Sequence, residues 1–336
     1  MKRSLTSAGL GISVALFCAQ PAMAESKSTA AKLQRATQLV DDYYGDRQGL
    51  EKAALLVSEV LAEDDQSARA YVEAARITIK GGHIVSRRFE PGTVDLSQAF
   101  IDRALAIEPN NVAAISLKAH AFLIGRDLAS ASRTLQQGLA LSPSYPWFHL
   151  DLAAYYRDIR DYQSAVAHYE VVIARGRGTD TDQRRAYPAA LAGISRIYGI
   201  PEHLVKLRDW AAKADEARNP KDAWTLGEFA EVFADMGAFD DALKYSRKAI
   251  AVMNYGRGRR TLAMALYGKA AQVSKDGQDG ARFLSEAMTI TDDAADIADW
   301  FGDAQPTVAA LLPVLQRLLL EAKRGKPPPP KPAPRS

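Results

Sequence analysis

Cysteine is almost absent from this 336-residue chain, which has a single one, Cys18. One thiol excludes a disulfide framework, a cysteine-based zinc cluster and a cysteine redox pair. The five histidines show no metal-binding spacing such as H-E-x-x-H. The sequence also lacks a G-x-x-x-x-G-K-S/T phosphate loop, a G-x-G-x-x-G turn and a G-x-S-x-G nucleophile elbow. These absences predict a protein that acts without a metal, without a cofactor and without catalysis.

Charge of one sign does not dominate the chain either. Its 43 basic and 40 acidic residues leave a net charge of +3. Residues 1–24 carry two basic side chains and no acid, and residues 323–336 carry five basic side chains and no acid. The segment between them therefore has a net charge of about −4. Because a nucleic-acid binder needs a basic body, no nucleic-acid partner is predicted.

The amino terminus has the pattern of a targeting segment. Two basic residues precede an apolar run at 10–18, which is too short to span a bilayer as a helix. Ala22 and Ala24 are small residues at the positions that a signal peptidase recognises. We predict cleavage between Ala24 and Glu25, a periplasmic or secreted protein, and no integral membrane span in the mature chain. A membrane anchor that stays attached is the alternative.

A repeat of 34 residues runs through the middle of the chain. When the sequence is shifted by 34, small residues fall on small residues, and aromatic residues fall on aromatic or large apolar residues. Shifts of 78 and 77 give matches of the same kind, as two such steps plus insertions of ten and nine residues. The pairs at a shift of 34 are Ala119 with Ala153, Phe122 with Tyr156, Ala131 with Ala165, and Leu135 with Tyr169. Such constant offsets predict a stack of repeated structural units.

The pattern resembles the tetratricopeptide repeat, whose period is 34 residues and whose unit is a pair of antiparallel helices. In the best copy, Ala153 and Ala165 stand at the small-residue positions and Tyr156 at the first-helix aromatic position. Alanine at these positions lets paired helix backbones approach closely. The first copy departs from the family, because Asp41 stands where a small residue is expected. The resemblance implies an all-α fold, a right-handed α-solenoid of helix-turn-helix repeats.

The predicted organisation follows the repeat copies. A signal peptide at 1–24 and a leader at 25–33 precede the solenoid at 34–304. A capping helix at 305–324 and a proline-rich basic tail at 325–336 follow it. The predicted repeats are 34–67, 68–111 with an insertion at 81–94, 112–145, 146–179, a degenerate 180–222, 223–256 and a degenerate 257–295.

Three of these segments allow more than one interpretation. The insertion at 81–94 is either a contact loop or an ordinary surface loop. The apolar stripe at 305–324 favours a helix that caps the stack, and a helix lying on a membrane surface is the alternative. The tail, with the sequence KPPPPKPAPRS, is expected to be extended, with or without a dedicated partner.

In the tetratricopeptide family, the concave face is formed largely by the second, fifth, ninth and twelfth positions of each repeat. Two tryptophans on this face are expected to hold an extended or helical peptide, with arginines binding its acidic groups. The alternative is that the tryptophans pack against neighbouring helices. The partner-binding residues that the resemblance implies are Arg69, Arg76, Ser116, His120, Trp147, Leu150, Arg157 and Trp224.

The sequence therefore predicts a non-catalytic protein-interaction scaffold of the cell envelope, with an unidentified protein or peptide as its partner. One alternative is an accessory or substrate-holding subunit of an envelope enzyme or of a secretion or assembly machine. Another is an enzyme whose site lies in the degenerate segment 180–222.

Overall fold

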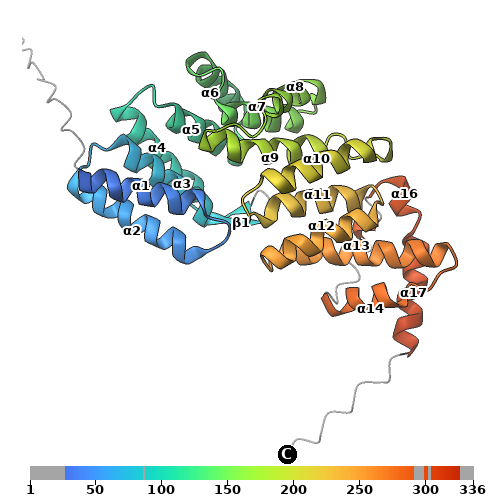
Figure 1. Ribbon diagram of the computed structural model, residues 1–336. Coiled ribbons are helices and arrows are strands. Elements are labelled where there is room, and N and C mark those ends of the chain that lie inside the picture. Colours follow the sequence, from blue (N-terminus) through green and yellow to red (C-terminus); the bar gives the residue numbers. More distant parts are fainter. Residues whose placement is uncertain (1–26, 86–87, 291–298, 302–303, 326–336) are drawn as a thin grey trace, which may run out of the picture.

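The structure, a computed structural model, describes residues 27–85, 88–290, 299–301 and 304–325. The predicted signal peptide at 1–24 and residues 326–336 of the predicted tail lie outside the described residues. Within the described ranges the chain folds almost entirely into helices, which follow one another as a stack from the blue to the red end of Figure 1.

The helices form seven consecutive antiparallel pairs in the described part of the chain. Each first helix packs against its own second helix and against the first helix of the next pair. The first helices therefore line one common face, which we call the inner face. The pairs are α1 (Lys27–Asp41) with α2 (Arg47–Glu63), α3 (Ala68–Gly82) with α4 (Thr93–Ile107), α5 (Val112–Ile124) with α6 (Leu128–Leu141), α7 (Pro146–Asp158) with α8 (Tyr162–Ala174), α9 (Thr181–Ser195) with α10 (Leu204–Ala217), α11 (Ala223–Asp235) with α12 (Phe239–Val252), and α13 (Gly256–Lys275) with α14 (Ala281–Ile290).

Small residues at regular positions allow this close pairing. A fully buried alanine leaves room for the backbone of the facing helix, and the aromatic residues fill the remaining space. The alanines at the small-residue positions of the repeat copies are all 0 % exposed: Ala53, Ala75, Ala104, Ala119, Ala131, Ala153, Ala165, Ala230 and Ala242. The expectation of an all-α solenoid of paired helices is confirmed.

Short polar residues begin many of these helices. Asp127 accepts a hydrogen bond from the backbone N–H of Ser130, and Asp161 does the same for Ser164. Asp46, Ser67, Asn111, Asp180 and Asp222 cap their helices in the same way. Each cap satisfies a backbone donor that has no partner inside the helix, which fixes the point where the chain turns into the next helix.

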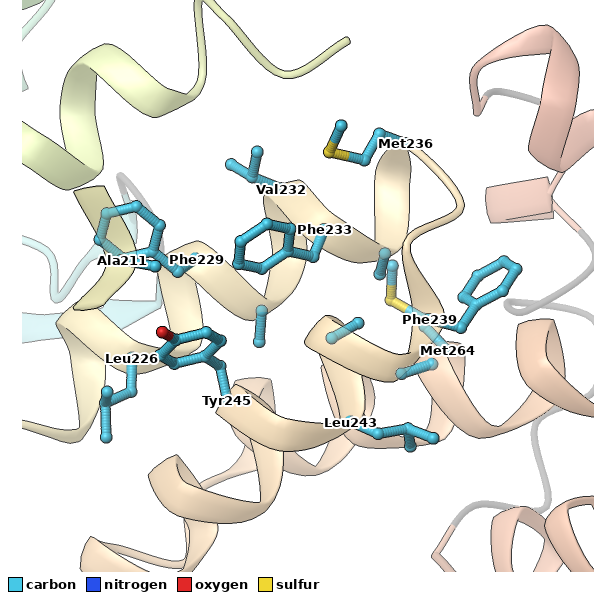
Figure 2. Close-up of a cluster of buried hydrophobic side chains, with 14 of the residues drawn as sticks. Ala211, Leu226, Phe229, Val232, Phe233, Met236, Phe239, Leu243, Tyr245 and Met264 are labelled. Atoms are coloured by element: carbon cyan, nitrogen blue, oxygen red, sulfur yellow. The ribbon is translucent and has the colours of Figure 1, made fainter. Parts of the chain in front are cut away.

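The hydrophobic core is not continuous along the stack. One core cluster joins α1, α2 and α3, with Leu33 and Val57 at its centre, and we call these three helices the N-terminal body. A much larger cluster extends from α7 to the last helix. Figure 2 shows part of it, where the stacked rings of Phe233 and Tyr245 lie 5.7 Å apart between α11 and α12. Between the two, only small clusters hold α3 to α7 together.

Two segments add detail to the predicted architecture. The insertion contains a short antiparallel ribbon of β1 (His83–Val85) and β2 (Arg88–Phe89), which is a small exception to the all-α expectation. The predicted capping helix is divided into α16 (Pro306–Ala309) and α17 (Leu312–Gly325). Pro313 lies in the first turn of α17, where a proline is tolerated, and α17 packs against α13.

Candidate interaction surface

The residues predicted to bind a partner all lie on first helices of the pairs, and these helices line the inner face. Arg69 and Arg76 lie on α3, Ser116 and His120 on α5, and Trp224 on α11. The helix α7 carries Trp147, Leu150 and Arg157.

A charged cluster joins α1, α3 and α9 on this face. Asp41, the last residue of α1, accepts hydrogen bonds from Arg76 and, at 2.7 Å, from Nη1 of Arg185. Nη1 of Arg76 also donates to both carboxylate oxygens of Glu73 at 3.0 Å. Because Glu73 is only 4 % exposed, its charge depends on this arginine. We call Asp41, Glu73, Arg76, Arg185 and the neighbouring Lys80 the inner charge cluster.

Lys80 differs from the other members of the inner charge cluster. Among the residues that the structure describes, no carboxylate forms an ion pair with it, and its Nζ lies 5.4 Å from the centroid of the Tyr43 ring. Burial, followed by the nearby charges of Arg185 and Arg76, lowers the pKa of Lys80 to about 7. The amine is therefore only partly charged at neutral pH.

Trp147 is bound to the next helix pair rather than left open. Its Nε1 donates to Oδ1 of Asp182 on α9 at 2.7 Å. The guanidinium of Arg185 lies 5.4 Å from the centroid of its ring, in a cation–π contact. Arg76 and Trp147, which were predicted to share one face, are thus joined through Asp41 and Arg185.

Trp224 contacts the opposite end of the solenoid. Its ring centroid lies 6.3 Å from that of Tyr43 and 5.8 Å from that of Tyr44, both in the turn after α1. Nearby, Nδ2 of Asn219 is 3.5 Å from Oδ1 of Asp42. Trp224 nevertheless remains 37 % exposed, so part of the ring is available at the surface.

The other predicted residues have varied surroundings. Nδ1 of His120 lies 3.0 Å from Oδ1 of Asp151, and Nη1 of Arg157 donates to the Tyr169 hydroxyl at 3.3 Å. Ser116 is buried, Leu150 is half-buried and Arg69 is exposed. The structure brings Arg76, Trp147 and Trp224 towards one region of the inner face, and a partner-binding role for the eight residues stays a prediction.

Sequence reasoning missed Asp41, Lys80 and Arg185 as members of this region. One signal was available, because Asp41 occupies a small-residue position of the first repeat. Arg185 lies in the degenerate segment 180–222, where no repeat register indicates which side chains point inwards. A second inner contact was missed for the same reason: Glu231 accepts hydrogen bonds from both Arg196 and Arg257, which links α9, α11 and the start of α13.

The inner face offers charged and aromatic contacts. In the described ranges, no three side chains of the kinds that bind metals come together. No helix in the described part of the chain is both long and apolar enough to cross a bilayer.

Comparisons with known proteins agree with the helical character of the chain. No family model and no curated protein matches the sequence. One similar solved structure comes from a functional characterisation of Pseudomonas aeruginosa pilF, at 15 % identity and a TM-score of 0.44, covering 69 % of this chain and 94 % of that one. Another is a tetratricopeptide repeat protein from Parabacteroides merdae, at 12 % identity and a TM-score of 0.44, covering 87 % of this chain and 100 % of that one.

The chain resembles tetratricopeptide repeat proteins in its fold. This assignment rests on its own helices: paired in succession, closed by buried alanines and lined by first helices on one face. A fold of this type suggests a protein-interaction scaffold, because stacked helix pairs create an extended binding surface.

Proposed function

We propose that the protein is a non-catalytic interaction scaffold of the cell envelope that binds a peptide or protein segment on its inner face. The observation that carries this proposal is Lys80, a largely buried amine beside two arginines and without a carboxylate partner in the described part of the chain. Stacking of the helix pairs does not need this amine, since buried alanines and aromatic residues close the pairs.

An acidic group of the partner suits this position. Removing an ammonium group from water costs free energy unless an opposite charge accompanies it. A carboxylate beside Lys80 would compensate that cost and return the pKa of the amine towards its ordinary value. The exposed part of Trp224 and the half-buried Leu150 supply apolar area nearby. Aromatic anchors next to charge-assisted contacts are the arrangement in which few residues dominate affinity.

The capture experiment compares two lysine variants after the partner has been identified by crosslinking and mass spectrometry in the native compartment. We expect Lys80→Met to lose at least about tenfold in affinity, since a hydrogen bond to a charged group is worth roughly 1.5–3 kcal/mol. The melting temperature should not fall, because Lys80 has no carboxylate to leave unpaired. Lys213→Met is the control, because that lysine is exposed on α10 and pairs only with Asp209. Full capture by Lys80→Met would contradict the proposed surface.

Export is the second part of the proposal. It is supported by the basic residues, the apolar run and the alanines of residues 1–24. The intact mass of the native protein should correspond to a chain that begins at Glu25. A mature protein that retains Met1 would contradict both export and the envelope location.

A further inference from the structure

The two ends of the inner face meet across the solenoid. The turn after α1 contacts α9 through Asp41 and Arg185, which are 144 residues apart in the sequence. It contacts the segment before α11 through Asp42 and Asn219, which are 177 residues apart. Tyr43 and Tyr44 lie against Trp224 at the start of α11. We call this set of residues the closing contact, and Figure 1 shows the end of the α1–α2 pair beside β1 and facing α11.

The closing contact differs in kind from the contacts within the stack. Helix pairs are closed by side chains that are 0 % exposed, such as Ala53 and Ala230. The closing contact consists of ion pairs, one long hydrogen bond and tilted aromatic rings, one of which is 37 % exposed. A cleft of about 440 Å³ remains beside it, lined among others by Tyr44, Lys221 and Met253. Polar, incompletely packed contacts of this kind are typical of interfaces that open.

The core on either side of the closing contact is divided. The apolar cluster of the N-terminal body does not merge with the large cluster that begins at α7. The helices α3 to α7 connect the two through small clusters such as Ile115, Leu135 and Phe148. A small change at each helix-pair junction there adds up to a large movement at the far end of a solenoid.

We propose that the N-terminal body acts as the arm of a clamp, which closes on α9–α11 through the closing contact and opens to give a partner access to the inner charge cluster. In the closed form Asp41 occupies both arginines, so the protein's own carboxylate takes the place of an acidic group from outside. Opening frees Arg185 from Asp41 and exposes Lys80 together with the ring of Trp224. The opening does not depend on the partner proposed above.

The test measures the distance between two spin labels by pulsed electron resonance. The labels are placed at Glu51→Cys on α2 and Ala251→Cys on α12, both exposed, in a Cys18→Ser background. The parent protein should give mainly a short distance. Arg185→Gln and Trp224→Ala should each raise the long-distance population about tenfold, as expected for the loss of a charge-assisted or aromatic contact. Circular dichroism should show the same helix content in all variants.

The matched control is Arg208→Gln, which removes an arginine that binds Asp241 within the C-terminal part and does not bridge the two ends. It should leave the distance distribution unchanged. Identical distributions in the parent, Arg185→Gln and Trp224→Ala would overturn the clamp, as would an equal shift in Arg208→Gln. If Arg185→Gln loses helix content, Tyr44→Ala tests the same contact without removing a buried charge. Because no partner is present, failure of the clamp leaves the proposed function standing, and failed capture leaves the clamp standing.

Discussion

Lys80 shows how one residue connects the inner face to pH. In the folded chain, burial and the two arginines lower its pKa to about 7, whereas the ordinary value is 10.5. The folded state therefore binds fewer protons than the unfolded state between these two values. Stability contributed by Lys80 must rise with pH through this window, because the unfolded chain alone has to release the proton. The groups that face this amine are Asp41, Glu73, Arg76 and Arg185, none of which titrates there.

We predict that Lys80→Met removes this pH dependence. Between pH 7 and pH 9 the urea midpoint of the parent should rise, by a free energy on the order of 1 kcal/mol per pH unit. The midpoint of Lys80→Met should be higher than that of the parent at pH 7 and nearly flat across the range. The tyrosine hydroxyls do not interfere, since burial raises the pKa of Tyr44 to about 12. Parallel curves for the two proteins would mean that the amine is solvated in the folded chain.

At the scale of the element, the helix pair is held by small residues at fixed positions. The sequence predicts these positions well, because backbone approach tolerates only a small side chain and therefore leaves a clear period. The helices of the degenerate segment 180–222 were predicted less well. There Gly193 takes the small-residue role by lying against the ring of Tyr169, so the spacing of alanines no longer marks the contact.

Enlarging a buried alanine should therefore destabilise the stack. Ala153→Leu and Ala165→Leu each replace a fully buried alanine and should cost on the order of 1–3 kcal/mol through overpacking. Ala140→Leu lies on the exposed side of α6 and should be nearly neutral. Thermal melts of the three variants provide the measurement. Equal tolerance at all three positions would show that the alanines do not set the helix spacing.

For the whole molecule, the stack could be predicted from the sequence but its closure could not. A repeat pattern encodes contacts between neighbouring units, which are the only contacts that an ideal solenoid needs. The pairing of Asp41 with Arg185 joins the first helix pair to the fifth, and no periodicity relates these two positions. The inner location of Arg76 and Trp147 was predicted because both belong to well-matched copies. Their actual partners, Asp41 and Asp182, are set by the curvature of the stack.

The closing contact also bears on how the chain folds. Helix pairs form from residues a few tens of positions apart, so the loops that must be closed are short and their entropy cost is small. The contact between Asp41 and Arg185 has to close a loop of 144 residues for little buried apolar surface. It can become favourable only after the intervening pairs have stacked and brought the two ends together. The charges on the inner face are thus the last part of the molecule to be assembled, and the first to separate when it is strained.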